Sequence, residues 1–458
     1  MARLARLLVA LCWFVGLGAV SGRSAPNVVI LFADDLGYGD IGPYGAEGYS
    51  TPNLDRMAAE GIRFTDFYVP APVCTPSRAA LLTGSYPMRV GLANRVLFPF
   101  SQHGLNPDEI TLAELLKGQG YRTMAVGKWH LGHQKKFLPT RQGFDEYLGI
   151  PYSNDMGSHR YPAQGFVSPP LPILHNEDLV DQHPSQALLT QRWTAAAVDF
   201  IERSAGSPFF LYLAHSMPHL PIDASSDFKG GTEHGLYGDV IEELDWSVGQ
   251  IFAALARAGV DDDTLVVFTS DNGPVVRPAR QLGHQSGSAG PLRGSKNTTW
   301  EGGMREPGLM RWPAKIPAGA VCRELATTMD LLPTIAKLAG ATPPADRIID
   351  GKDIAPLLFA EPGARSPHEA FYYYRDERLQ AVRSGRWKLH TYRPEWNDQP
   401  HEPLLFDLET DVGETTDVAA KNPEVVARLQ VLADKARADL GDAARGRRGQ
   451  NARPPGRL

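Results

Sequence analysis

The chain has 458 residues, of which 43% are hydrophobic and 21% charged, a composition typical of a globular protein. This length is sufficient for one large domain and a smaller one, each with its own core. The formal net charge of −6 excludes a general nucleic-acid binder, because such proteins are basic, and an anionic substrate would need a local cationic site.

The first 25 residues have the layout of a signal peptide. Arg3 and Arg6 precede an apolar run from Leu7 to Val20, and small residues follow. The run is too short and wrongly flanked to favour the alternative, a membrane anchor, and no later stretch is long and apolar enough to cross a bilayer. We therefore expect an exported protein, periplasmic or secreted, without stable membrane insertion.

Predicted strands and helices alternate through residues 26–365. Buried strands are predicted from three apolar runs, residues 27–33 (NVVILFA), 208–214 (PFFLYLA) and 264–270 (TLVVFTS). Helices are predicted over residues 52–60, from a capping box of Thr111 and Glu114 to Gly118, and over residues 330–338. This alternation is typical of an α/β domain with a large mixed, mostly parallel sheet flanked by helices.

Residues 366–440 are predicted to form a smaller α+β domain. The segment 371–392 alternates aromatic and polar residues and predicts a hairpin that turns at Ser384-Gly385. Another strand and a helix from Pro423 to Leu440 follow, so an antiparallel sheet with a helix is expected. The tail, residues 441–458, is rich in glycine, proline and arginine, and its composition predicts disorder.

Polar residues stand at the ends of the predicted strands. Asp34-Asp35 and Asp271-Asn272 follow two of them, Lys128 and His130 follow the apolar residues 124–126, and His215 and His219 follow the strand at 208–214. Ligands of open α/β sheets bind beyond the carboxyl ends of the strands, so we expect these groups to converge. The four acidic and amide side chains supply only oxygen, which suits Ca²⁺ or Mg²⁺ better than zinc, although each pair alone is typical of a turn or helix cap.

Cys74 lies in the segment VPAPVCTPSRAALLTG (69–84). Pro76 suits the first turn of a helix and places Cys74 at its N-terminal end, where the helix dipole and Arg78 would lower the pKa of a thiol. Once Cys12 leaves with the signal peptide, Cys322 is the other cysteine of the mature chain. The residues alone leave three alternatives open: a thiolate nucleophile, a disulfide with Cys322, or a buried structural cysteine.

The segment CTPSR (74–78) with the following AALLTG matches the signature of type I sulfatases, and GKWHLG (127–132) resembles their second signature. The agreement extends through FADDLGYGD, PYSND, HLP, SDNGP, GSKNTTWEGGMREP and DLLPT. The chain is similar to this formylglycine-dependent family over most of its mature length, and it looks closest to the branch of arylsulfatase A and N-acetylgalactosamine-6-sulfatase. The resemblance implies an alkaline-phosphatase-like fold and hydrolysis of a sulfate monoester.

The resemblance also implies the nucleophile and the cofactor. Cys74 would be oxidised by a formylglycine-generating enzyme to Cα-formylglycine, whose hydrate has one hydroxyl that attacks sulfur and a second that expels sulfate. Asp34, Asp35, Asp271 and Asn272, with the modified Cys74 adjacent, would hold the divalent cation, Ca²⁺ or alternatively Mg²⁺.

The remaining matched residues take roles by the same resemblance. Arg78 and Lys128 would stabilise the formylglycine oxyanion, Asp271 would take the proton of the attacking hydroxyl, and His130 would be the base that triggers sulfate elimination. The sulfate pocket would comprise Ser153, Lys128, His219 and Lys296, with His219 and Lys296 also assisting the leaving alcohol.

Two other functions stay open at this point. A phosphonate or phosphate-ester hydrolase of the same superfamily can share the fold and the nucleophile, and an inactive carbohydrate-binding relative would share the fold alone. The expected residue type stands at every matched catalytic position, which disfavours the inactive relative. The scarcity of cysteine favours a bacterial protein, and the substrate could be an aryl sulfate, a sulfated sugar or a sulfolipid.

Overall fold

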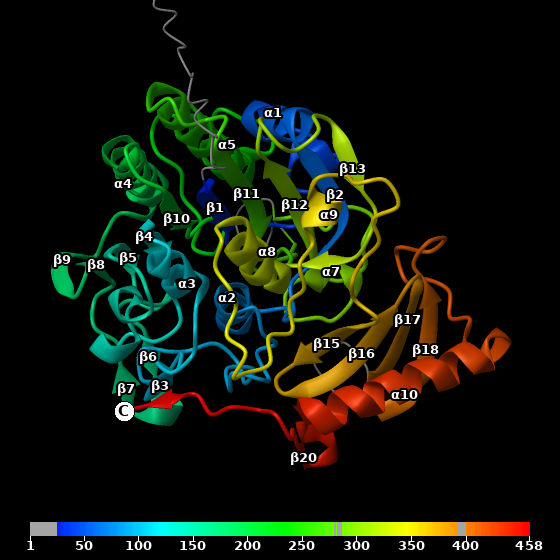
Figure 1. Ribbon diagram of the computed structural model, residues 1–458. Helices are drawn as coiled ribbons and strands as arrows, with labels where there is room; N and C mark the ends of the chain where they lie inside the picture. The colour runs from blue at the N-terminus through cyan, green and yellow to red at the C-terminus, as the bar shows by residue number, and fades with distance from the viewer. Residues whose placement is uncertain (1–24, 279–280, 282–285, 393–399) are drawn as a thin grey trace, which may run out of the picture.

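A mixed sheet of eleven strands forms the centre of the protein (Figure 1). The computed structural model describes residues 25–278, 281, 286–392 and 400–458, so all but one residue of the predicted signal peptide lies outside the described part. Strands β11, β1, β10, β4 and β5 are parallel neighbours, whereas β12 runs antiparallel between β11 and β2. The spatial order is β13 (Ala320–Cys322), β2 (Ile62–Tyr68), β12 (Arg305–Arg311), β11 (Thr264–Ser270), β1 (Asn27–Ala33), β10 (Phe209–Ala214), β4 (Arg122–Lys128), β5 (Glu146–Ile150), β8 (Pro172–His175) and β9 (Asp178–Gln182), with β14 (Ala326–Thr327) also on β2.

Helices cover both faces of this sheet (Figure 1). Side chains of β1 alternate between two cores, because successive residues of a strand point to opposite faces: Val28 and Ile30 pack with α2, α3 and α8, whereas Val29 and Leu31 pack with α1, α4 and α5. The helix bounds are α1 Pro52–Glu60, α2 Cys74–Thr83, α3 Leu112–Gly118, α4 Leu189–Ser204, α5 Gly235–Arg257, α7 Glu301–Met304, α8 Leu331–Leu338 and α9 Ala355–Leu358. The capping box of Thr111 and Glu114 is confirmed at the start of α3.

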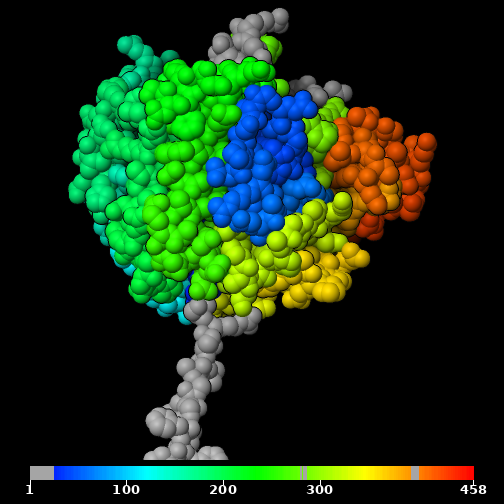
Figure 2. All heavy atoms as spheres, turned by 90° about the horizontal axis from the view of Figure 1, so that it is seen from above, coloured from blue at the N-terminus to red at the C-terminus, as the bar shows by residue number. Residues whose placement is uncertain are grey.

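The C-terminal domain is a four-stranded antiparallel sheet with one long helix against it. Its strands are β15 (Phe371–Arg375), β16 (Arg378–Ser384), β17 (Trp387–Tyr392) and β18 (Pro400–Asp407), and its helix is α10 (Pro423–Asp439). The predicted hairpin is confirmed as β16–β17, but the aromatic residues before it form a further strand, β15. Figure 2 shows this domain against one side of the larger one, and Tyr68 and Met304 join its core.

Residues 441–458, which composition predicts to be disordered, fold first against the C-terminal domain and then against the larger one. β19 (Gly441–Asp442) pairs with β20 (Arg447–Arg448), and β21 (Gly456–Arg457) pairs with β3 (His103–Gly104), so the tail runs back across the molecule (Figure 1). Arg453 and Glu109 form a bidentate ion pair at 2.7 and 2.9 Å. The prediction of disorder is therefore wrong, since composition does not reveal the distant acid that pairs with the tail.

The predicted fold class, a mostly parallel mixed sheet with helices and a smaller antiparallel domain, is confirmed. The domain limits at residues 365 and 440 stay predictions. None of the helices in the described residues is both long enough and apolar enough to cross a membrane. A short hairpin of β6 (Arg160–Tyr161) and β7 (Phe166–Val167) lies in the loop region after β5.

Candidate active site

Four strand ends bring the predicted polar residues together. The strands β11, β1, β10 and β4 are parallel and adjacent, so the residues that follow them lie at one edge of the sheet. Asp34 and Asp35 follow β1, Asp271 and Asn272 follow β11, and Lys128 ends β4. All five are buried. The expected convergence at the carboxyl ends is therefore confirmed for these five residues.

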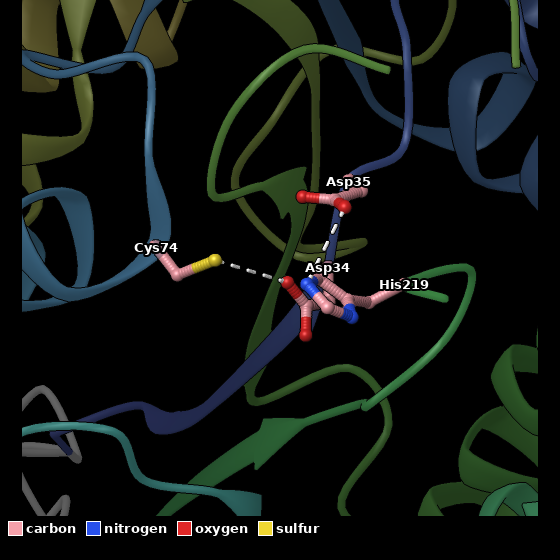
Figure 3. A group of neighbouring side chains, drawn as sticks. All are labelled: Asp34, Asp35, Cys74 and His219. Carbon is pink, nitrogen blue, oxygen red and sulfur yellow. Dashed lines mark hydrogen bonds and ion pairs between the residues drawn. The ribbon is translucent and has the colours of Figure 1, made fainter. Parts of the chain in front are cut away.

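Cys74 is the first residue of α2 and points into this cluster (Figure 3). Its Sγ lies 3.6 Å from Asp34 Oδ1 and 3.8 Å from Lys296 Nζ. Cys74 and Cys322 are both free, so the disulfide alternative is not adopted. Burial raises the pKa of the Cys74 thiol despite Lys128 and Lys296. The predicted lowering by the helix end is therefore wrong, because desolvation of the thiolate exceeds the effect of the nearby cations.

One half of the cluster is a network around Asp34 and Asp271. Lys128 Nζ lies 2.5 Å from Asp34 Oδ2 and 3.2 Å from Ser153 Oγ. Arg78 donates two hydrogen bonds to Asp271 Oδ2, at 3.0 and 2.7 Å. Burial acts to raise the pKa of Asp34, but Lys128, His219 and Arg78 lower it overall, whereas burial and the neighbouring Asp34 raise the pKa of Asp271. Asp34 is thus the carboxylate that its surroundings hold ionised.

The other half is centred on Asp35. Lys296 Nζ lies 2.6 Å from Asp35 Oδ1, and His219 Nε2 lies 3.7 Å from Asp35 Oδ2. Asn272 donates from Nδ2 to Asp35 Oδ1 at 2.8 Å, and its Oδ1 is buried and has no partner in the part of the chain that the structure describes. Burial raises the pKa of Asp35, but Lys296 and His219 outweigh it and the net shift is downward.

A group of four side chains could share one metal ion. Ligand atoms of Asp34, Asp35, Cys74 and His219 all lie within 4.8 Å of one another, and their side chains converge in Figure 3. Asp271, a predicted ligand, is not in that group: one of its oxygens accepts the Arg78 hydrogen bonds and the other accepts from the Asp35 backbone N–H at 3.1 Å.

His130 lies beside the cluster and contacts the loop before β3. Its Nε2 is 2.8 Å from the Leu97 carbonyl oxygen, and its Nδ1 is buried without a partner among the described residues. Burial, with Lys128 and Arg78, lowers the pKa of His130 far below its usual value, so the ring is neutral at pH 7. His215 is not part of the site and contacts Ser247 at 3.3 Å.

Sequence reasoning missed two connecting residues. Thr75 Oγ1 donates to the His130 carbonyl at 2.8 Å and accepts from the Leu97 N–H at 3.1 Å. Thr75 lies in the motif of Cys74 and could have been singled out there, whereas no sequence signal marks Leu97. Lys296 lies in the loop 290–296, and the Arg293 guanidinium of the same loop lies 3.6 Å from the centre of the Trp300 ring.

The site combines a buried cysteine with two lysines, an arginine and several carboxylates. Such a site suits hydrolysis of an ester of a tetrahedral oxyanion, because fixed cations stabilise the negative charge that develops on its oxygens. The protein is therefore a hydrolase with its site at the carboxyl edge of an α/β sheet.

Comparisons with known proteins give the family. Residues 26–341 match the family model "Sulfatase", and residues 366–446 match "C-terminal region of aryl-sulfatase". The chain is 43% identical to arylsulfatase A of Bos taurus, over 92% of this chain and 90% of that protein. It is 40% identical to N-acetylgalactosamine-6-sulfatase of Canis lupus familiaris, over 93% and 87%.

A solved structure agrees. The crystal structure of PsFucS1 sulfatase from Pseudoalteromonas sp. superposes with a TM-score of 0.81 and 31% identity, covering 90% of each chain. The chain belongs to the sulfatase family and is a sulfuric ester hydrolase with the alkaline-phosphatase-like fold that its motifs predicted.

Proposed function

We propose that the protein is an exported sulfatase that hydrolyses a sulfate monoester with Cα-formylglycine, made from Cys74, and a divalent cation, Ca²⁺ in preference to Mg²⁺. The observation that carries this proposal is the position of Cys74 between the Asp34 carboxylate and the Lys296 ammonium group. Because burial raises the pKa of its thiol, Cys74 itself would be protonated at neutral pH and a poor nucleophile. An oxygen nucleophile formed by modification suits this position better.

The surrounding residues fit a hard cation. Asp34 and Asp35 offer carboxylate oxygens within one small group, and the unpartnered Oδ1 of Asn272 is a buried acceptor that a cation would satisfy. Oxygen donors of this kind favour Ca²⁺ or Mg²⁺. These three residues, with Asp271 beside them, would hold the ion, which when bound would neutralise sulfate oxygens and favour ionisation of the nucleophile.

The chain's cations would hold the substrate sulfate. Burial acts to lower the pKa of each lysine, but Asp34 raises the pKa of Lys128 and Asp35 raises that of Lys296, and the net shift is upward for both. Both ammonium groups are therefore charged at neutral pH. Lys128 would bind a sulfate oxygen together with Ser153, which it contacts. Arg78 is committed to Asp271 and to the Lys128 carbonyl, so its contribution is to fix these two groups.

Proton transfer would use the two histidines. The Leu97 carbonyl accepts from Nε2 of neutral His130, which leaves Nδ1 free to take the proton whose loss releases sulfate. His219 Nδ1 is held at 2.6 Å by the Leu220 carbonyl, so Nε2 is the nitrogen directed at Asp35 and at the leaving alcohol.

The experiment that tests the nucleophile is the mass of the tryptic peptide FTDFYVPAPVCTPSR, residues 64–78, from protein purified from its native host. We expect the mass of an aldehyde in place of the thiol. The peptide that contains Cys322, IPAGAVCR, is the internal control and should carry an unmodified thiol. An unmodified Cys74 from a host that matures its other sulfatases would contradict the proposal.

A comparison of turnover rates on different esters tests which class of ester the protein hydrolyses. The protein should hydrolyse an aryl sulfate faster than an aryl phosphonate or an aryl phosphodiester, and thiol-alkylating reagents should not inactivate it. The reverse preference would favour the phosphonate hydrolase, and binding of sulfated sugars without turnover would favour an inactive relative. Export rests on Arg3, Arg6 and the apolar run after them, and N-terminal sequencing of the purified protein tests it.

A further inference from the structure

A basic groove lies beside the C-terminal tail, away from the cluster around Cys74. It has a volume of about 870 Å³ and runs between the tail and the loop that leads from α2 to β3. The tail, residues 441–458, contains five arginines, Arg445, Arg447, Arg448, Arg453 and Arg457, and one acidic residue, Asp442, which is buried and paired with Arg437. We call this the arginine groove and define it by Asn94, His103, Arg447, Arg448 and Arg457.

Most of the positive charge in the arginine groove is uncompensated. Arg447, Arg448 and Arg457 are exposed, and within the described part of the chain they form no ion pair. The nearby carboxylate of Glu109 is committed to Arg453. Glu377 is the acidic residue in the lining. This concentration of positive charge stands out on a chain whose formal net charge is −6.

Tertiary contacts fix the walls of the arginine groove. The pairing of β21 with β3 and the bidentate Arg453–Glu109 contact fix the tail along it. Arg457 pairs with His103 in the β21–β3 register, which places it beside the opposite wall, and burial with the Arg457 guanidinium lowers the pKa of His103. A guanidinium matches a sulfate or carboxylate group with two parallel hydrogen bonds, so exposed arginines on a fixed backbone suit such anions.

The groove also lies near the active site. Asn94 lines it, and Leu97, three residues further on, contacts both Thr75 and His130. Three residues span at most about 11 Å between Cα atoms. The groove and the active site thus lie at the two ends of the short segment 94–97, and only a substrate longer than a small aryl sulfate could contact both.

We propose that the arginine groove binds anionic groups of a sulfated oligosaccharide while another sulfate ester of the same chain occupies the active site. The inference rests on the proposed function and names its substrate class. The groove lining contains no Phe, Tyr or Trp among the described residues, so it lacks the stacking surfaces by which proteins hold single-stranded nucleic acids. The matched family segment ends at residue 446, so these three arginines lie outside it.

The test replaces the three exposed arginines together, in the variant R447S/R448S/R457S. The control variant R56S/R257S/K315S also removes three positive charges, but from exposed positions outside the groove and the site. Substrates are p-nitrophenyl sulfate and a sulfated hexasaccharide. Because each exposed charged contact contributes modestly, we expect the groove variant to raise KM for the hexasaccharide about tenfold, and to leave kcat/KM for p-nitrophenyl sulfate within about twofold of the unmutated protein.

Three outcomes would overturn the inference: an unchanged KM for the hexasaccharide, an equal loss on both substrates, or the same loss in the control variant. Binding of the hexasaccharide to the Cys74→Ala protein, by calorimetry, separates this inference from the proposed function, because it needs no turnover. That binding should weaken with salt and with the groove variant. Equally tight binding of an oligoadenylate of the same charge would assign the groove to nucleic acid instead.

Discussion

Replacing Lys388 with methionine should destabilise the protein through a buried charge cluster. Lys388 lies in β17 with its side chain fully buried, and Nζ is 2.9 Å from Glu301 Oε1, 2.9 Å from Glu414 Oε1 and 2.9 Å from the Thr299 carbonyl. Methionine keeps the length of the side chain but removes the charge. Two buried carboxylates would then face each other without their shared cation.

Breaking a buried ion pair by removing one partner costs about 3–5 kcal/mol. We expect the lower end, about 3 kcal/mol, because Glu301 retains Arg305 at 3.4 Å. Although burial raises the pKa of Glu301, Lys388, Arg305 and Arg383 together lower it well below its usual value. A carboxyl with a lowered pKa stabilises the folded state above its unfolded pKa and loses that effect as the pH falls, so the difference between variant and unmutated protein should narrow below about pH 4.5.

The assay is urea unfolding at pH 7 and at pH 4, followed by tryptophan fluorescence. Lys337→Met is the matched control, because Lys337 is exposed and pairs with Asp353 at the surface, and no measurable change is expected there. The double variant Lys388→Met/Glu301→Gln should recover part of the loss. If Lys388→Met changed the unfolding free energy by less than about 0.5 kcal/mol, the cluster would be dispensable and the reasoning refuted.

The remaining predictions concern the site and its acid stability. Asp34→Asn should reduce turnover of an aryl sulfate at least about 100-fold and weaken Ca²⁺ binding measured by calorimetry, and unmutated kinetics would remove Asp34 from the site. Lys296→Ala should raise KM for an aryl sulfate about tenfold, whereas unchanged kinetics would return its loop to an ordinary basic surface. Burial lowers the pKa of His215 to about 3, and burial with Lys388 lowers that of His390 to about 4. Both rings are neutral in the folded state, so stability is complete above the unfolded pKa of 6.5 and should fall between pH 6.5 and 4; an unfolding free energy that stayed constant over that window would contradict both assignments.

The features that the sequence predicted well are local ones. The run NVVILFA is apolar at every position, which is typical of a strand covered on both faces, and β1 occupies those seven residues. Asp34-Asp35 and Asp271-Asn272 directly follow such runs, so their convergence needed only that β1 and β11 be parallel neighbours. The signature around Cys74 carries the family resemblance, and that resemblance implied the fold family and the sulfatase activity.

The features that the sequence did not predict depend on distant partners. The raised pKa of the Cys74 thiol follows from burial by segments that a local view of α2 does not include. The folded tail depends on Glu109, which lies 344 residues from Arg453 in the chain. Arg293 belongs to the same loop as Lys296, but its guanidinium lies over the Trp300 ring and donates to the Glu414 carbonyl.

The position of Lys296 depends on contacts with both domains. Lys296 belongs to a segment with little regular structure of its own, between β11 and α7. The larger domain holds one end, since the Lys296 N–H donates to the Pro274 carbonyl at 2.9 Å. The C-terminal domain holds the other: Lys388 donates to the Thr299 carbonyl, and Glu414 accepts from the Glu301 N–H at 2.7 Å. Because the ammonium group that faces Asp35 and Cys74 is fixed from both sides, a disturbance of the buried cluster at Lys388 would also displace a charge at the reaction centre.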